Sequence, residues 1–331
     1  MKKDMKKDMN INAGKKRVSV NAPARRLLCT AALFIAAAAM IPAAGTFASV
    51  KVYAETGIGP GAGSQQVQGT QQIKTRNGYA NGELISLNKE WKYADMSMIN
   101  SGAAVVYTAS ANRKDKVIAV NAGHGTKGGS SVKTYCHPDK SLKLTGGSTA
   151  AGAEKATAVS SGMTFNDGTP EAVVTLRMAQ LLRDKLLSRG YDVIMLRDGE
   201  DVQLDNIART VIANNTADAH IALHWDGDSL KTIKGCFYMS VPDGLKKMEP
   251  VTSYWQQHEA LGDALIKGLA GQGMKIWSSN PLDMDLTQTS YSTVPSVDIE
   301  LGNQCSRHDD ELLSQEAEGL ANGIDMFFGI S

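Results

Sequence analysis

Residues 117–129 read VIAVNAGHGTKGG, an apolar run that ends in a glycine-rich turn holding one histidine. The aliphatic residues 117–120 have the length and β-branched content of a buried strand, and the glycines after them mark an abrupt turn. His124 lies between two glycines, so its imidazole has room to reach a metal ion, a ligand or a substrate. Loop histidines often satisfy only local hydrogen bonds, so the rest of the chain must decide whether this one takes part in chemistry.

From residue 116 onward, strand patterns alternate with helix patterns along the chain. This alternation predicts an α/β fold in which a twisted, mostly parallel, mixed sheet carries helices on both faces. We assign residues 112–331 to a single domain of this class. Strands are expected at 117–121, 191–196, 220–225, 235–241 and 295–301, and helices at 170–189, 203–215, 253–270 and 308–327.

The composition, 42% hydrophobic and 21% charged residues, is ordinary for a globular protein. The formal net charge of +1 conceals an asymmetry, because residues 1–54 hold ten Lys or Arg against two acidic residues and the remainder carries a charge of −7. An acidic chain offers no clustered positive face for phosphates, so we expect no nucleic-acid partner. Beyond residue 54 only Cys136, Cys236 and Cys305 remain. Three scattered cysteines make no disulfide framework, although one pair could form.

The N-terminal block is typical of a secretory signal peptide. Basic residues at 15–17 and 25–26 precede the uncharged run LLCTAALFIAAAAMI, and A-x-A-like cleavage motifs end at Ala48 and Ala54. The run is shorter than the roughly twenty residues that span a bilayer, so a permanent membrane helix is the weaker interpretation. We therefore predict a signal peptide at 1–54, a secreted protein located outside the cell or in the cell wall, and no stable membrane insertion after cleavage.

Three further segments differ in composition from the main domain. Residues 55–80 are rich in Gly, Gln and Ser without apolar periodicity, which predicts a flexible linker. Residues 81–111 hold too little apolar material for a domain and are expected to form an N-terminal extension that packs on the main domain. Residues 126–169 are an unusually long stretch of small residues, for which we expect a mobile flap over a substrate.

Three polar residues fall at the carboxyl ends of predicted strands. His124 follows the first strand, His224 lies near the end of HIALHW, and Glu300 lies near the end of the apolar strand PSVDIEL. In open α/β sheets ligands bind in the crevice beyond the carboxyl ends of the strands, so we expect the three side chains to share one crevice. Each signal is weak alone, but their common placement is hard to assign to chance.

A fourth candidate, Glu171, opens the helix predicted at 170–189. Thr169 is expected to be its N-cap and Pro170 its first helical residue. With about 100° between successive residues, Glu171 lies within about 20° of Leu182, on the stripe that faces the sheet. First-turn glutamates usually lie on the surface, but an inward carboxylate needs a partner because a buried unpaired charge is costly. A metal ion would satisfy this need.

Two histidines and a glutamate around an open fourth position are typical of a catalytic zinc site. We therefore predict that His124, Glu171 and His224 bind one Zn2+ ion, which lowers the pKa of a bound water toward about 7 and polarises a carbonyl oxygen. The remaining acid, Glu300, is then the catalytic general base, which takes the proton of the water and passes it to a leaving amine. The predicted reaction is hydrolysis of an amide.

Four segments, in this order, resemble the zinc-dependent N-acetylmuramoyl-L-alanine amidases of bacterial cell-wall metabolism: NAGHG, PEAVVTL, RDGEDVQLDNIARTVIANNTADAHIALHWDG and VPSVDIELGN. The resemblance covers about residues 116–328 and implies a zinc amidase catalytic domain at 112–331. It implies zinc ligation by His124, Glu171 and His224 and acid/base catalysis by Glu300. The implied reaction cleaves the amide bond between N-acetylmuramic acid and the L-alanine of the stem peptide. Peptidoglycan is then the expected partner, and we expect the enzyme to be a monomer.

Two other functions remain open from the sequence. A non-catalytic cell-wall-binding relative would keep the fold without turnover, although such a protein needs no general base at Glu300. A zinc peptidase or deacetylase would use the same centre on another amide. The products distinguish these functions, because only the amidase releases intact stem peptides.

The other histidines have structural interpretations. His220 is expected to be a buried, hydrogen-bonded residue deeper in the strand 220–225. Cys136 and His137 are adjacent but lack a second pair of ligands that would complete a metal site. His258 and His308 are predicted to lie on the surface or to cap helices.

Overall fold

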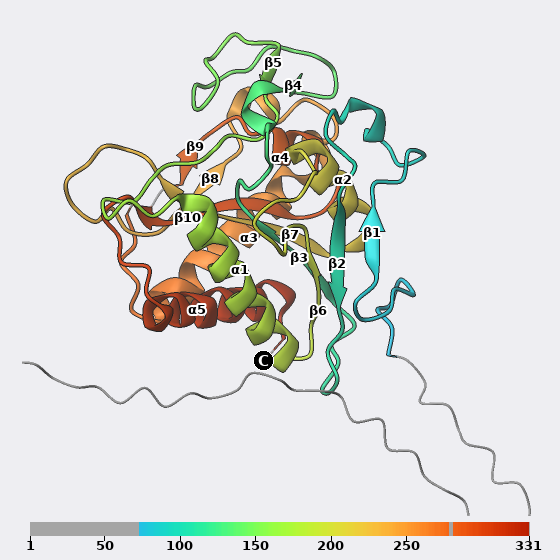
Figure 1. The fold of residues 1–331 in the computed structure, drawn as a ribbon, viewed down its shortest axis with the longest axis vertical. Helices are drawn as coiled ribbons and strands as arrows, with labels where there is room; N and C mark the ends of the chain where they lie inside the picture. Colours follow the sequence, from blue (N-terminus) through green and yellow to red (C-terminus); the bar gives the residue numbers. More distant parts are fainter. Residues whose placement is uncertain (1–72, 278–280, 331) are drawn as a thin grey trace, which may run out of the picture. The chain divides into compact units, whose positions relative to one another are not determined.

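The computed structural model describes residues 73–277 and 281–330 (Figure 1). The predicted signal peptide and residues 55–72 of the predicted linker lie outside the described residues. The main sheet has eight strands in the order β1-β2-β6-β3-β7-β10-β8-β9. The strands are β1 (Leu84–Ser86), β2 (Ala103–Tyr107), β3 (Val117–Ala122), β6 (Asp192–Met195), β7 (Ala219–Asp226), β8 (Phe237–Ser240), β9 (Leu282–Asp283) and β10 (Ser296–Asn303).

The centre of the sheet is parallel and helices cover both of its faces. Strands β6, β3, β7 and β10 pair in parallel, whereas β2 is antiparallel to β6 and β8 is antiparallel to β10. Figure 1 shows α3 and α5 on one side of the sheet and α2 and α4 on the other. The predicted α/β class with a mostly parallel, mixed sheet is therefore confirmed. The helices are α1 (Glu171–Ser188), α2 (Asn206–Thr216), α3 (Val251–Gly271), α4 (Thr287–Tyr291) and α5 (Asp310–Phe328).

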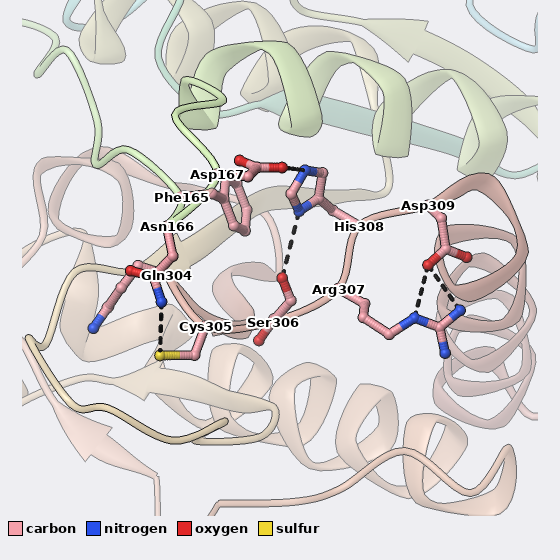
Figure 2. A pocket seen from close by; sticks show the side chains of 9 residues that line it. All are labelled: Phe165, Asn166, Asp167, Gln304, Cys305, Ser306, Arg307, His308 and Asp309. Atoms are coloured by element: carbon pink, nitrogen blue, oxygen red, sulfur yellow. Dashed lines mark hydrogen bonds and ion pairs between the residues drawn. The ribbon is translucent and has the colours of Figure 1, made fainter. Parts of the chain in front are cut away.

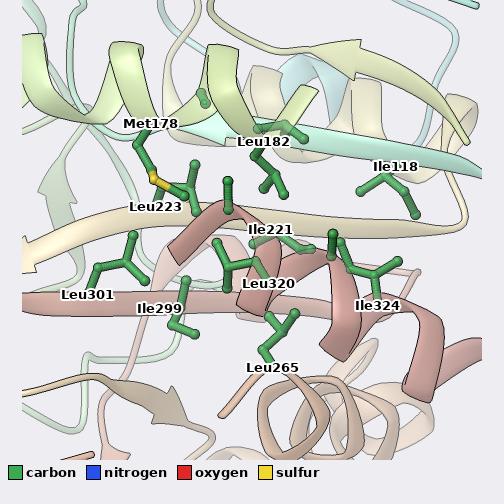
Figure 3. Close-up of a cluster of buried hydrophobic side chains, with 14 of the residues drawn as sticks. Ile118, Met178, Leu182, Ile221, Leu223, Leu265, Ile299, Leu301, Leu320 and Ile324 are labelled. Carbon is green, nitrogen blue, oxygen red and sulfur yellow. The ribbon is translucent and has the colours of Figure 1, made fainter. Parts of the chain in front are cut away.

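Alternate residues of β3 enter two hydrophobic cores, one on each face of the sheet. Ile118 and Val120 pack with side chains of α1, α3 and α5, whereas Val117 and Ala119 pack with those of α2. Figure 3 shows the first core, where Leu182 of α1 lies near the aliphatic side chains of the central strands. Full burial of such a side chain contributes about 1.5–3 kcal/mol. Packing of this kind, more than intrinsic helix propensity, holds the helices on the sheet.

The N-terminal extension at 81–111 supplies two strands to the main sheet. β2 pairs with β6 through Val105, Val106 and Tyr107, and β1 pairs with β2 at the edge. Residues 73–80, which the sequence assigned to the flexible linker, form a turn with a bridge between Lys74 and Ala80. Arg76 in this turn makes an ion pair of 2.9 Å with Asp218, so the contacts with the domain begin before residue 81.

The long stretch at 126–169 contains a small antiparallel sheet and a buried polar anchor. His137 Nε2 donates a hydrogen bond of 2.9 Å to Asp285 Oδ1, and both side chains are buried. The backbone N–H of Leu144 donates to the other oxygen of Asp285 at 2.6 Å. These bonds account for His137 as a structural residue, and the mobility of this stretch stays a prediction. Its elements are the 3-10 helix Gly129–Ser131 and the strands β4 (Lys133–Tyr135) and β5 (Lys155–Thr157).

The described residues contain no disulfide, because Cys136, Cys236 and Cys305 are free thiols. None of the helices in the described part of the chain combines the length and the apolar character needed to cross a membrane.

Candidate metal centre

The ligating atoms of His124, Glu171 and His224 converge at the carboxyl ends of β3 and β7. They lie within 4.8 Å of one another. His124 Nε2 is 2.9 Å from Glu171 Oε2, and His224 Nδ1 is 3.1 Å from Glu171 Oε1 and 3.0 Å from His124 Nε2. The structure thus brings together the three residues that the sequence selected from distant segments.

The turn after β3 holds His124 in a left-handed conformation, with φ of 66°. Two buried arginines fix this turn through its carbonyl oxygens. Arg209 donates to the carbonyl of His124 at 2.7 Å, and Arg197 donates to that of Gly123 at 3.0 Å. Burial lowers the pKa of Arg209 to about 9, so the guanidinium remains charged at neutral pH. Arg197 carries no pattern that marks it as a functional residue in the sequence.

Glu171 begins α1 and points inward, as its helical direction predicted, with only 2% of its surface exposed. Pro170 is the N-cap, so the helix begins one residue later than the Thr169 cap implied, within the usual uncertainty of helix ends. The backbone N–H of Trp225 donates to Oε1 at 3.0 Å, and that of Met163 donates to Oε2 at 2.8 Å. Burial opposes ionisation, but the imidazoles of His124 and His224 beside the carboxylate outweigh it and hold the pKa of Glu171 well below its usual range.

The three residues fit a tetrahedral metal ion. Ligands about 2.0–2.1 Å from zinc in a tetrahedron are about 3.3 Å apart, close to the separations of 2.9–3.1 Å between these atoms. His124 Nδ1 donates to the carbonyl oxygen of Ser160 at 2.9 Å, which leaves the lone pair of Nε2 facing the cluster. Such an outer hydrogen bond fixes the tautomer of a ligand histidine. The donor set of two nitrogens and one carboxylate is one that zinc accepts.

Residues 160–163, from the end of the long stretch, form a strap across the cluster. The strap holds two ligands through its backbone, because Ser160 accepts from His124 and Met163 donates to Glu171. Gly162 lies between these contacts with φ of +83°, and a Cβ built there would lie 2.7 Å from His124 Cδ2 and 2.8 Å from Glu171 Oε2. Only glycine fits at this position without displacing a ligand.

If the cluster binds zinc, as the sequence predicts, Gly162→Ala should weaken that binding about 10- to 100-fold, the usual cost of disturbing the surroundings of a metal ligand. Competition with a chromophoric chelator measures the change. Gly168→Ala is the matched control, because Gly168 has φ of +93° but nothing within 4 Å of its built Cβ. Equal weakening in both variants would show that backbone strain, and not contact with the ligands, causes the effect.

Glu300 lies on β10 directly across from His224 of β7 in the parallel register. Its side chain is 8% exposed, and its Oε2 is buried without a hydrogen-bond partner among the described residues. Burial and the negative charges of Asp298 and Glu171 raise the pKa of Glu300 well above its usual value. A carboxylate with a free oxygen beside the three candidate ligands is suited to proton transfer.

Asp298, two residues before Glu300 on β10, is a site residue that the sequence analysis missed. Its Oδ2 lies 3.8 Å from His224 Nε2, on the side of the ring away from the cluster. The sequence did contain a pattern that could have identified it. Alternation along the strand places Asp298 on the same face as Glu300, while Val297 and Ile299 enter the core.

A cavity of about 620 Å³ opens over these residues. Its polar walls include carboxylates from α1, β7 and β10, and Met239, Met284 and Leu286 contribute apolar surface. Gly147 and Ser148 belong to the long stretch at 126–169, which therefore borders the cavity as expected of a segment near the substrate. The cavity is lined by His124, Gly147, Ser148, Ser160, Ser161, Gly162, Met163, Glu171, His224, Trp225, Asp226, Gly227, Met239, Met284, Leu286, Asp298 and Glu300.

A second hollow, of about 450 Å³, lies where residues 165–167 meet residues 304–309 (Figure 2). Its polar groups pair with one another: His308 Nε2 lies 3.2 Å from Asp167 Oδ2, and Asn166 Nδ2 donates to Cys305 Sγ at 3.2 Å. Phe165 packs on His308 with ring centroids 4.2 Å apart. These contacts hold residues 165–167 in place, close in sequence to Met163, which is one of the backbone donors to Glu171.

The remaining histidines divide between confirmed and wrong predictions. His220 is buried, with Nδ1 3.3 Å from Ser296 Oγ, as expected. The surface prediction for His258 is wrong: it is buried on α3, and its Nδ1 accepts a hydrogen bond of 2.9 Å from the backbone N–H of Ser296. His308 is partly exposed and precedes α5, whose N-cap is Asp309.

The protein is thus an α/β protein whose mixed sheet places two histidines and two glutamates in one cavity. Three of these residues form a candidate site for a single metal ion. The family model for N-acetylmuramoyl-L-alanine amidase matches residues 118–325, and the chain belongs to this family. The enzyme class inferred from the sequence is thereby confirmed. No curated protein sequence matches the chain.

Solved structures share the fold. The N-acetylmuramyl-L-alanine amidase from Mycobacterium smegmatis is similar with a TM-score of 0.54 and 19% identity, over 66% of this chain and 99% of its own. The apo form of the N-acetylmuramyl-L-alanine amidase from Mycobacterium abscessus has a TM-score of 0.51 and 20% identity, over 64% of this chain and 98% of its own. At these identities the likeness concerns the fold, and family membership rests on the sequence match.

Proposed function

We propose that this enzyme uses one zinc ion to hydrolyse the amide bond between the lactyl group of N-acetylmuramic acid and the L-alanine of the stem peptide. His124, Glu171 and His224 bind the ion, and Glu300 is the general base. The observation that carries the proposal is the convergence of the three ligating atoms within 4.8 Å, with Glu300 directly across from His224. Family membership supports the substrate class.

Bound zinc supplies Lewis acidity, which favours deprotonation of a water molecule near neutral pH and polarises the scissile carbonyl. Residues of the protein provide proton transfer and positioning. Glu300 takes the proton of the attacking water through its unpartnered oxygen and delivers it to the leaving nitrogen of L-alanine. The Ser160–Met163 strap and the β7–β10 register keep ligands and base in fixed relative positions, which reduces reorganisation during the reaction.

The proposed setting is the bacterial cell wall. The signal peptide at 1–54 directs export, the linker from residue 55 precedes the catalytic domain, and the mature enzyme acts as a secreted monomer on peptidoglycan. The signal-peptide pattern of the N-terminal block supports export. Membership of the amidase family supports action on peptidoglycan.

The test is metal dependence together with product identity. Purified protein is expected to carry one zinc ion per chain by elemental analysis. A chelator should abolish the release of stem peptides from purified sacculi, and addition of one equivalent of zinc should restore it. Unchanged activity after complete removal of metal would overturn the proposal.

Mass spectrometry of the digest separates this function from its two alternatives. Intact stem peptides that begin with L-alanine support the amidase. Shortened peptides would identify a peptidase, and deacetylated sugars would identify a deacetylase. Zinc binding without any product would identify a non-catalytic wall-binding protein.

A further inference from the structure

Asp298 stands out because one oxygen of its carboxylate is buried beside other acids, although its side chain is 15% exposed. It lines the same cavity as Glu171 and Glu300, and its Oδ1 has no hydrogen-bond partner among the described residues. Its neighbour across the sheet is Ala222, whose side chain offers no polar group. Burying a carboxylate without a partner is costly, so a compensating donor is expected close by.

The nearest candidate donor is the outer nitrogen of His224. His224 Nδ1 faces the candidate ligands, whereas His224 Nε2 faces Asp298 Oδ2 at 3.8 Å. A neutral histidine that binds a metal through Nδ1 must carry its proton on Nε2. Asp298 Oδ2 is the carboxylate oxygen that the described residues place opposite this nitrogen, and an approach of about 0.6 Å from 3.8 Å brings the pair within hydrogen-bond distance.

We propose that Asp298 is a positioning residue of the metal centre, which accepts a hydrogen bond from Nε2–H of His224 and so fixes the tautomer that presents Nδ1 to zinc. The inference rests on the proposed function, because it assumes that the cluster binds the ion. His124 has a corresponding partner in the carbonyl oxygen of Ser160. Each ligand histidine is thus oriented through its outer nitrogen, one by backbone and one by a carboxylate.

The test measures zinc affinity, by chelator competition, in the wild-type protein and in Asp298→Ala and Asp298→Asn. We expect Asp298→Ala to weaken zinc binding about 10- to 100-fold, as loss of an outer partner of a ligand histidine typically does. Asp298→Asn should weaken it less, because the amide oxygen still accepts from Nε2–H but lacks the charge. Asp298→Asn also serves if the alanine variant fails to fold.

Asp226→Asn is the matched control for charge, because Asp226 lines the same cavity but pairs with Lys234 and not with His224. It should leave zinc affinity close to that of the wild type. Replacing zinc by cobalt gives a spectroscopic readout: the visible bands of the cobalt protein should shift in Asp298→Ala and stay unchanged in Asp226→Asn. A general loss of stability would not produce this difference.

The outcomes distinguish a failure of the proposed function from a failure of the role assigned to Asp298. If the wild-type protein binds no zinc, the proposed function fails and the role of Asp298 fails with it. If the wild-type protein binds zinc and Asp298→Ala binds it equally well with an unshifted cobalt spectrum, only the role of Asp298 is overturned. Equal weakening in Asp298→Ala and Asp226→Asn also overturns it, because bulk cavity charge would then explain both.

Discussion

His224→Ala is expected to lose zinc binding and hydrolysis together. The substitution removes one of the three proposed ligands and leaves Glu171 and His124 as an incomplete set. A structural role of His224 alone would instead leave the metal content unchanged. Elemental analysis should find much less than one zinc per chain, and release of stem peptides from sacculi should fall to background.

His258→Ala controls for the effect of removing a buried histidine. His258 is buried and accepts a hydrogen bond from the backbone N–H of Ser296, and it is not one of the three candidate ligands. We expect this variant to lose some thermal stability and to keep one zinc per chain. Normal zinc content and activity in His224→Ala would remove His224 from the centre and with it the proposed mechanism.

The parts of the fold that the sequence predicted are those encoded by local periodicity. The β3 run is apolar on both faces because both faces are covered by helices. A continuous apolar run of this kind is typical of a central parallel strand and could be predicted from the sequence. Glu171 was placed correctly because helical geometry fixes its direction from Leu182 without knowledge of the partner. His124 and His224 followed from the rule that parallel strands end at one edge of the sheet.

The parts that the sequence did not predict depend on distant partners. Strands β1 and β2 join the sheet only because β6 offers a free edge, and no local pattern at 81–111 encodes that register. His258 was misplaced although it lies three residues before Leu261 and seven before Leu265, on the apolar stripe of α3. A histidine on such a stripe can be buried when a backbone donor meets it, here the N–H of Ser296.

Asp298 illustrates a different difficulty. Its strand face could be predicted from alternation with Val297 and Ile299, but its role depends on which nitrogen of His224 faces the metal. That orientation depends on contacts with His124, Glu171 and Asp298, which come from distant segments, and cannot be derived from spacing. The same holds for Arg197, whose hydrogen bonds to the His124 turn connect residues more than 70 positions apart.

Glu300→Gln is expected to separate binding from catalysis. Glutamine keeps the size of the side chain but cannot take a proton, and Glu300 is not among the three ligating residues. Zinc content should therefore stay at one per chain and KM should change little. The value of kcat should fall about 10²- to 10⁴-fold, the usual contribution of a general base. Steady-state kinetics on a defined muropeptide, with zinc measured on the same sample, gives all three quantities.

Glu316→Gln is the matched control, because Glu316 on α5 is also buried with an unpartnered oxygen and a raised pKa but lies outside the catalytic cavity. Its kcat should equal that of the wild type, which would show that removing a buried acid is not in itself inactivating. Unchanged kcat in Glu300→Gln would contradict the assignment of the base. Asp298 would then be the remaining candidate for the general base, since it is the other β10 carboxylate in the cavity. A loss of kcat in Asp298→Asn at saturating zinc would assign that role to Asp298.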